Sequence, residues 1–254
     1  MARVILITSG KGGTGKTILT TNLALVLTEL NKRVFVIDAN LTTPHLSYFF
    51  GFSLTSSTLH DFLAERKDLN EVIHFHSSGI KILPGSLKTK DIIDVNPDRL
   101  LDAVIKLLPL ADYILLDGSA GIGRETIYAM NVADEIILVV NPELPSVVDG
   151  LKIIELAKSL DKKVIGVVVN RVGARESELS LEKIQSLIGE RIIGIIPEDR
   201  EVGRSVDFRI PLLKLNPNSP AALAIKKIGY SLEGKQFKFE RVSFFHKIRK
   251  FLGL

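Results

Sequence analysis

The chain has 254 residues, of which 46% are hydrophobic and 24% are charged, and its formal net charge is +4. These values are typical of one large globular domain, and they exclude a disordered or repetitive chain. The absence of cysteine excludes a disulfide framework, a thiol nucleophile and any cysteine-ligated zinc or iron–sulfur centre.

The first predicted element is a strand at Val4–Thr8, which leads directly into glycines. Its apolar run is too short for a signal peptide or a membrane span, so we expect a cytoplasmic protein. The next residues match the phosphate-loop pattern G-x-x-x-x-G-K-[ST], and a helical pattern follows at 16–30, which is the context that this motif requires. The predicted phosphate-binding residues are Gly10, Lys11, Gly12, Gly13, Thr14, Gly15, Lys16 and Thr17.

The chemistry of this loop points to ATP with Mg²⁺. Successive backbone N–H groups of a glycine-rich loop can turn toward phosphate oxygens, and the helix N-terminus adds the positive end of its dipole. We expect Lys16 to contact the β- and γ-phosphates and the Thr17 hydroxyl to be a magnesium ligand. The alternative, a tight turn without a ligand, does not explain the lysine and threonine.

Short apolar runs recur along the rest of the chain, with helical patterns between them, including 147–160 and 220–232. The region 41–76 is weakly patterned, and we expect loops and short helices there. The further predicted strands are Val34–Asp38, Ile80–Leu83, Tyr113–Asp117, Ile136–Val140, Val164–Asn170 and Ile192–Ile196. This alternation predicts a doubly wound α/β fold with a mainly parallel sheet, in which ligands bind at the carboxyl ends of strands.

Two aspartates stand at the ends of predicted strands. Asp38 ends the second run and Asp117 ends the fourth. Magnesium or its water ligands need a negative partner at this edge of the sheet, so we assign both to the metal site. Either residue alone could instead be a helix cap or a loop residue. His45, His60, His74 and His76 lack the spacing of metal ligands, and no Ser–His–acid set stands out.

The string K-G-G-T-G-K-T at 11–17 resembles the deviant Walker A motif of the MinD/ParA ATPases, and the chain looks closest to MinD. The landmarks of the resemblance are the segments 117–121, 141–143, 169–171 and 196–199, in that order. It implies a P-loop NTPase fold and a homodimer in which Lys11 reaches the partner's phosphates. It also implies a second switch at 118–121, including Gly121, near the γ-phosphate. The adenine-side residues that it implies are Asn170, Arg171, Pro197 and Glu198.

Two positions depart from the family pattern. The family usually has aspartate where this chain has Asn40, and an amide cannot be a general base, although it can orient a water. We therefore list Lys11, Lys16, Asp38 and Asn40 as catalytic residues and predict slow hydrolysis. Ile18 lies at a nucleotide-binding position where the family commonly has threonine, so one side-chain phosphate contact is expected to be missing.

The C-terminal segment carries the basic excess of the chain. Residues 235–254 hold six basic residues against Glu240, a charge of +5, which leaves −1 for residues 1–234. The apolar residues Phe244, Phe245, Ile248, Phe251 and Leu252 fall on one helical face, and the basic residues Lys247, Arg249 and Lys250 lie elsewhere on it. This pattern predicts an amphipathic helix that binds anionic membrane lipid, as the MinD resemblance also implies. The alternative is a last core-packing helix.

These observations predict an ATPase domain at 1–233 and a membrane-targeting tail at 234–254. The leading hypothesis is a MinD-like ATPase at the inner face of the cell membrane. This ATPase would position an unidentified protein partner or be stimulated by an activator. One alternative is a scaffold that binds ATP without hydrolysing it. Another is a ParA-like DNA-partition ATPase. The charge of −1 over residues 1–234 makes nucleic acid an unlikely partner, because non-specific DNA binding needs several cations.

Overall fold

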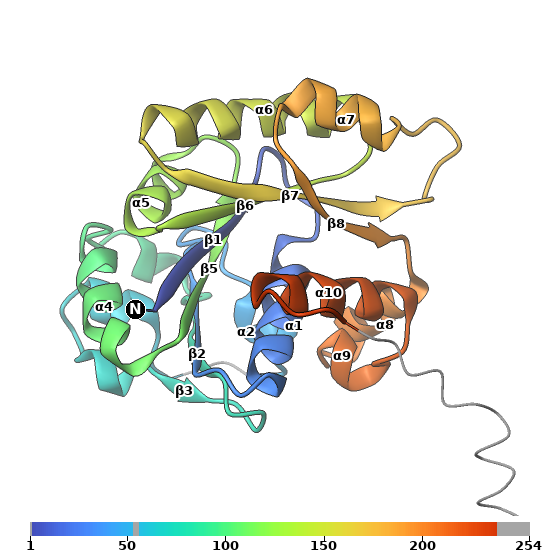
Figure 1. The fold of residues 1–254 in the computed structure, drawn as a ribbon. Coiled ribbons are helices and arrows are strands. Elements are labelled where there is room, and N and C mark those ends of the chain that lie inside the picture. Colours follow the sequence, from blue (N-terminus) through green and yellow to red (C-terminus); the bar gives the residue numbers. More distant parts are fainter. Residues whose placement is uncertain (1, 53–55, 238–254) are drawn as a thin grey trace, which may run out of the picture.

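A central eight-stranded sheet organises the molecule, which we describe from a computed structural model over residues 2–52 and 56–237 (Figure 1). The strand order is β3-β4-β2-β5-β1-β6-β7-β8, and every neighbouring pair is parallel except β3 with β4. The strands are β1 (Arg3–Ser9), β2 (Val34–Asp38), β3 (His74–Phe75), β4 (Lys81–Leu83), β5 (Tyr113–Ala120), β6 (Glu135–Val140), β7 (Lys163–Val172) and β8 (Ile192–Pro197). The predicted doubly wound fold is confirmed.

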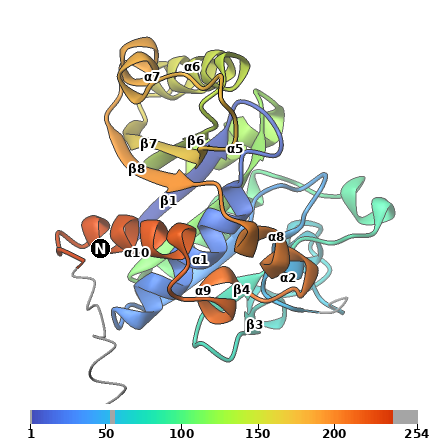
Figure 2. The same cartoon turned by 90° about the vertical axis from the view of Figure 1, so that its right-hand side faces the viewer.

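Helices cover both faces of the sheet (Figures 1 and 2). The helices are α1 (Lys16–Glu29), α2 (Leu46–Phe49), α3 (Leu59–Leu63), α4 (Arg99–Leu107), α5 (Arg124–Val132), α6 (Leu144–Ser159), α7 (Leu181–Ile188), α8 (Arg200–Asp207), α9 (Leu212–Leu215) and α10 (Pro220–Leu232), and the 3₁₀ turns are η1 (Leu69–Glu71), η2 (Thr89–Ile92) and η3 (Leu108–Leu110). Residues of α3 to α7 pack on one face, and residues of α1, α2, α9 and α10 pack on the other.

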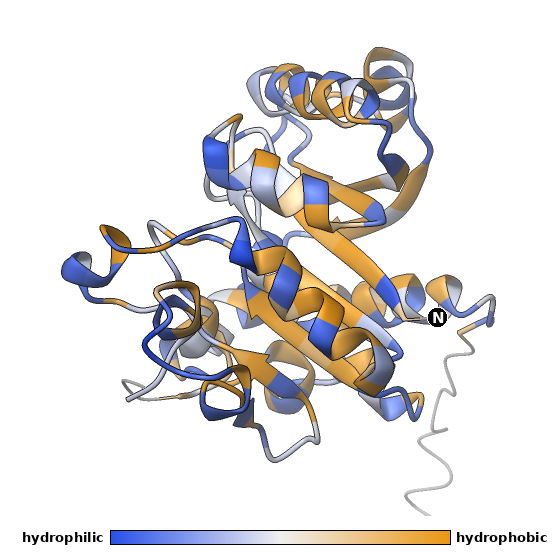
Figure 3. Ribbon diagram, turned by 90° about the vertical axis from the view of Figure 1, so that its left-hand side faces the viewer, coloured by the Kyte–Doolittle hydropathy of each residue, from blue (hydrophilic) through white to orange (hydrophobic). Residues whose placement is uncertain are grey.

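The buried strands explain why the sheet lies in the middle. Along β1, Val4 and Leu6 contribute to one apolar layer, whereas Ile5 and Ile7 contribute to the opposite layer. Side chains alternate between the two faces of a strand, so a continuous apolar run needs cover on both. Figure 3 shows this arrangement as largely apolar strands between helices in which polar and apolar residues are mixed.

The structure shifts most predicted strand ends by one or two residues, extends one strand by three and adds a strand. Asp117 does not end its strand, because β5 continues to Ala120, which pairs with Ser9 of β1. Gly118 permits this close pairing, since a Cβ there would lie 2.9 Å from the Ile7 carbonyl oxygen. The added strand β3 is short and antiparallel to β4.

The last described helix ends close to position 233, and the predicted division into 1–233 and 234–254 stays a prediction. Helix α10 ends at Leu232, and Gly234 follows with φ 65°, a left-handed conformation that favours glycine. The predicted membrane residues Phe244 to Leu252 lie outside the described residues, so the tail stays a prediction. Within residues 2–52 and 56–237, no helix has the length and apolarity that crossing a bilayer requires.

Candidate functional site

The loop between β1 and α1 forms a cradle made of backbone. Gly13 and Gly15 have φ values of 74° and 93°, which side chains rarely adopt. A Cβ at Gly15 would lie 2.3 Å from Asn170 Nδ2, and that amide donates a hydrogen bond of 2.7 Å to the Thr14 carbonyl oxygen. A Cβ at Gly10 would lie 2.2 Å from backbone carbon of Asp149. Close neighbours therefore demand glycine at both positions.

Lys16 lies inside this cradle and is ready for an anion. Its side chain is nearly buried, and Nζ donates a 3.0 Å hydrogen bond to Ser9 Oγ. Burial lowers the pKa of Lys16, and the charge of Asp117 partly opposes that effect. Thr14 Oγ1 is buried and has no hydrogen-bond partner within the described part of the chain. Lys16 also lines the larger cavity beside the loop, where its ammonium group could bind a phosphate, so the residues present fit a nucleotide.

Asp38 and Asp117 come together as direct neighbours on β2 and β5. Asp117 accepts a 2.8 Å hydrogen bond from the Thr17 hydroxyl, and the Thr20 hydroxyl lies 3.0 Å from its other oxygen. Asp38 accepts from the backbone N–H of Leu46 at 3.0 Å. Two carboxylates and a hydroxyl are oxygen ligands of the kind that Mg²⁺ prefers, directly or through water.

The two carboxyl groups hold protons more tightly than usual. Burial raises the pKa of Asp117 to about 6. Burial, and then repulsion from Asp117, raise the pKa of Asp38 well above its ordinary value. Like charges in one desolvated site oppose ionisation, and a bound cation would relieve this cost.

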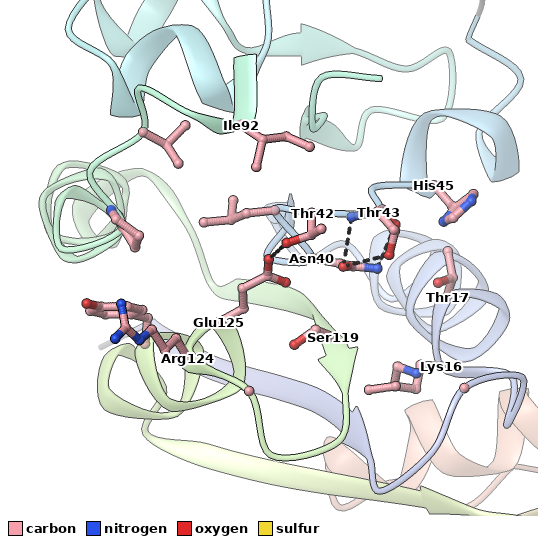
Figure 4. A pocket seen from close by; sticks show the side chains of 18 of the residues that line it. Lys16, Thr17, Asn40, Thr42, Thr43, His45, Ile92, Ser119, Arg124 and Glu125 are labelled. Carbon is pink, nitrogen blue, oxygen red and sulfur yellow. Dashed lines mark hydrogen bonds between the residues drawn. The ribbon is translucent and has the colours of Figure 1, made fainter. Parts of the chain in front are cut away.

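The loop after β2, residues 39–45, forms the opposite wall of the site, and side chains hold it. The Asn40 amide donates to the Thr43 carbonyl oxygen at 2.6 Å and accepts from Thr43 Oγ1 at 3.1 Å. The Thr42 hydroxyl donates to Glu125 Oε1 at the start of α5. Figure 4 shows Asn40, Thr42 and Glu125 on one side of the cavity and Lys16 and Thr17 on the other.

Two cavities border the phosphate loop. The larger, of about 960 Å³, lies between the phosphate loop and the loop 39–45 and extends to Ile92 and Tyr128 (Figure 4). The second, of about 280 Å³, lies beside α1. Its lining includes Ile18 and the predicted adenine-side residues Asn170, Arg171, Pro197 and Glu198. Arg171 Nε donates to Glu198 Oε2 at 2.7 Å at its rim.

Lys11 lies apart from Lys16 although both belong to one loop. Its Nζ pairs with Glu143 Oε2 at 3.0 Å, and Glu143 Oε1 lies 3.4 Å from Arg175. The hydrogen bond from Lys11 lowers the pKa of Glu143, so this glutamate is ionised at neutral pH. The side chain of Lys11 is about one-third exposed. Lys11 therefore points away from its own phosphate cradle.

Sequence reasoning found the cradle but missed residues that complete the site. Ser9 bridges Lys16 and the Lys11 carbonyl oxygen, and Thr20 adds a second hydroxyl at Asp117. Thr20 could have been found, because it lies one helical turn after Thr17. Thr42 and Glu125 meet across 83 residues of sequence, and no local pattern signals such a pair. Gly121 is placed beside the loop, where its N–H donates to the Ser9 carbonyl oxygen.

Comparison with known proteins identifies the family. The model of the CobQ/CobB/MinD/ParA nucleotide-binding domain matches residues 5–212. The chain belongs to this family. An uncharacterised ATP-binding protein of Methanocaldococcus jannaschii is 37% identical over 254 residues, covering 98% of this chain and 96% of the relative. The septum site-determining protein MinD of a Synechocystis strain is 32% identical, covering 94% and 92%.

Solved structures of MinD proteins share the fold. MinD of Pyrococcus horikoshii, complexed with Mg-ADP, has a TM-score of 0.88 at 33% identity, covering 92% of this chain and 96% of that chain. MinD of Aquifex aeolicus, in a complex with MinC, has a TM-score of 0.82 at 31% identity, covering 94% and 99%. The chain is thus a P-loop ATPase of the MinD/ParA family that resembles MinD, and the prediction of ATP and Mg²⁺ agrees with the Pyrococcus complex.

Proposed function

We propose that this chain is an ATP-dependent homodimer that attaches reversibly to the inner face of the cell membrane and there positions a protein partner, with slow ATP hydrolysis. The observation that carries the proposal is the divergence of two lysines in one phosphate loop. Lys16 occupies its own cradle, whereas Lys11 extends outward to Glu143. A cation presented outside its own site is suited to the phosphates of a second copy.

The roles of the site residues follow from their positions. The backbone of residues 10–17 would cradle the phosphates, and Lys16 would bind the γ-phosphate. Thr17 would coordinate Mg²⁺. Asp117 and Asp38 would bind the same ion, either directly or through its water ligands. Bound Mg²⁺ neutralises charge on the transferred phosphoryl group.

Exposed apolar residues flank the Lys11–Glu143 pair and support an interface there. Ile122 follows the end of β5, and Leu144 and Val148 lie at the start of α6, all of them exposed. Apolar side chains around a charged centre are common where proteins associate. A second copy facing this surface would cover these residues and bring its triphosphate to Lys11.

The tail would couple this dimer to the membrane. Full burial of an apolar side chain contributes roughly 1.5–3 kcal/mol and each basic residue about 1 kcal/mol, against about 1–2 kcal/mol per residue for ordering. One tail should therefore bind marginally. Two tails on one dimer gain from effective concentration, which makes membrane attachment depend on ATP.

A test of the proposal combines light scattering with liposome sedimentation. Full-length protein with ATP should elute as a dimer and sediment with anionic liposomes, and with ADP it should do neither. Lys11→Ala should remain monomeric with ATP while still binding nucleotide. A version ending at Glu233 should dimerise but stay in the supernatant. Lipid binding by that shortened version would refute the role of the tail, and ATP-dependent, salt-sensitive DNA binding would favour partition instead.

The environment of Asn40 favours a second candidate, a scaffold that binds ATP but does not hydrolyse it. The Asn40 amide is already engaged by Thr43, which limits its use in orienting a water. Phosphate release by wild type and Asn40→Asp separates the two candidates. Slow release by wild type with faster release by the variant supports the proposal, whereas inert behaviour of both supports the scaffold. Rapid release by wild type would contradict both.

The proposed partner is a protein. The Aquifex MinD structure is a complex with MinC, so a resemblance to MinD favours a protein rather than a nucleic acid as the partner. We expect that partner to recognise the ATP-bound dimer, because only this state joins the two copies at the membrane.

A further inference from the structure

His60 on α3 is fully buried, and both of its ring nitrogens are engaged. Nε2 lies 2.8 Å from the Leu41 carbonyl oxygen, and Nδ1 lies 3.0 Å from the Ser86 backbone nitrogen. A carbonyl oxygen can only accept and a backbone N–H can only donate. The ring is therefore neutral, with its proton on Nε2. It joins the loop 39–45 to the loop that follows β4.

The surroundings of His60 agree with this neutral form. Burial lowers its pKa, while Asp91 and Asp61 favour the charged form and Arg66 opposes it. Asp61 and Asp91 are themselves paired with Arg66, at 3.0 and 3.1 Å. The negative charges beside the ring are thus largely compensated, and the uncharged ring serves as a bridge between two backbone groups.

The bridge acts on the segment that carries Asn40. Leu41 is the next residue along the chain, so a hold on its carbonyl group restrains the backbone beside Asn40. Packing holds the same loop from another side, because a Cβ on Gly85 would lie 2.3 Å from Pro44 Cβ and 3.4 Å from the His60 ring. Contacts with neighbouring residues therefore restrain both Leu41 and Pro44. Asn40, which belongs to the same loop, lines the cavity that Lys16 and Thr17 also line (Figure 4).

We propose that His60 is a positioning residue for ATP hydrolysis, which holds the Leu41 carbonyl group so that Asn40 faces the phosphate site. The inference rests on the role proposed for Asn40. Histidine suits this place because one rigid ring supplies a donor and an acceptor in different directions. The hydrogen bonds of His60 go to Leu41 and Ser86, neither of which is assigned to phosphate or magnesium, so its effect on hydrolysis is transmitted through the loop.

Two isosteric replacements separate the two hydrogen bonds. In His60→Gln the side-chain amide reaches the place of Nε2 and can still donate to Leu41. In His60→Asn the shorter amide reaches only the place of Nδ1 and can still accept from Ser86. We expect His60→Asn to lower kcat about tenfold with unchanged ATP affinity, and His60→Gln to stay within about threefold of wild type. Urea unfolding of both variants controls for stability.

Amide hydrogen exchange with ATP present gives a readout that does not need turnover. Residues 39–46 should exchange about tenfold faster in His60→Asn than in His60→Gln, with the β1 and β5 strands unchanged. If wild type proves inert, the proposal of slow hydrolysis and the part of His60 in it both fail, and this exchange difference then decides only whether His60 holds the loop 39–45. Equal exchange and equal kcat in the two folded variants would overturn the inference, as would parallel losses of kcat and ATP affinity.

Gly85→Ala provides a second route if His60→Asn does not fold. The added Cβ would press on Pro44 at 2.3 Å and displace the loop, whereas its distance of 3.4 Å from the His60 ring is an ordinary contact. Because the Gly85 backbone hydrogen-bonds Asp38, Mg²⁺-dependent ATP binding is measured alongside. A fall in kcat with retained ATP binding and faster exchange at 39–46 supports the inference. Wild-type turnover and exchange in this variant would contradict it. Asn40→Ala tests whether Asn40 contributes to hydrolysis. Unchanged turnover in this variant would show that it does not, and the role proposed for His60 would then fail as well.

Discussion

Two loops leave the same edge of the sheet, and they are held in different ways. The phosphate loop after β1 is shaped mainly by its own backbone, through left-handed glycines and the close approach of the Asp149 backbone, and the Asn170 side chain adds a hydrogen bond to the Thr14 carbonyl oxygen. The loop 39–45 after β2 is fixed by side chains that come from elsewhere, including His60 and Glu125. Both loops border the same cavity.

The difference suggests a division of labour. A cradle made of backbone gains nothing from side-chain rearrangement, so it can stay preorganised for phosphate. A loop held by a few side-chain hydrogen bonds can be released at small cost, because each bond contributes only about 0.5–1.5 kcal/mol. We infer that the phosphate loop provides binding, whereas the loop 39–45 provides the step that can be regulated.

The largest expected effect comes from breaking the cradle. Gly15→Ala should lower the free energy of unfolding by about 2–4 kcal/mol, because φ is 93° and the new Cβ meets Asn170 Nδ2. Displacing the loop should weaken ATP binding about 100-fold. Gly12→Ala is the matched control, since its Cβ would have no neighbour within 4 Å. Thermal unfolding and fluorescent-nucleotide titration measure both. Equal melting of the two variants would refute the claim that contacts within the fold fix this loop.

The same contrast explains what sequence could and could not reveal. The phosphate loop is readable because glycine, lysine and threonine are each required locally, at fixed spacing. The seven predicted strands were readable because burial on both faces demands continuous apolar runs. His60, Glu125 and Glu143 act through partners far away in sequence, and their residue types are equally common on ordinary surfaces. Strand β3 was uncertain because two residues are too few to show a period.

The second expected effect is a pH dependence located at the boundary between the two loops. Asp117 has a folded-state pKa of about 6, above the usual unfolded value near 3.9. Stability from this group is therefore fully present below about pH 4 and is lost as pH rises through about 6. In the absence of nucleotide and Mg²⁺, raising the pH from about 5 to about 8 should cost about 1–1.5 kcal/mol at this site, because part of the loss has already occurred by pH 5.

Urea unfolding gives the free energy of unfolding of wild type and of Asp117→Asn at both pH values. The pH-dependent loss in wild type minus that in the variant is the contribution of Asp117. The asparagine variant should lack the loss, and it should be the more stable protein at the higher pH. Its turnover should fall about 100-fold, since the negative partner for magnesium is gone. Asp38 also has a raised pKa, so some pH dependence should persist in the variant. An unchanged pH profile would show that Asp117 ionises without penalty.

A smaller effect is expected from the loop held by side chains. Thr42→Val removes the hydrogen bond to Glu125 and should change kcat about threefold, with stability within about 0.5 kcal/mol. Glu125→Gln keeps an acceptor for the Thr42 hydroxyl and should behave like wild type. Steady-state phosphate release with saturating ATP gives kcat for both. If Glu125→Gln matched Thr42→Val, a neutral acceptor would not be enough, and the hydrogen bond would depend on the charge of Glu125.

The smallest effect is expected at the ion pair between Lys11 of the phosphate loop and Glu143, which lies outside that loop. In the monomer Glu143 competes for the cation that a partner's phosphates would bind, so Glu143→Gln should tighten the ATP dimer about two- to threefold. The pair is partly exposed, and high salt should remove the difference. Glu182→Gln removes an equal charge on α7, away from Lys11, and controls for net charge. Sedimentation at low and high salt measures the dimer constant. A weaker dimer in Glu143→Gln would instead place Glu143 among the groups that hold the two copies together.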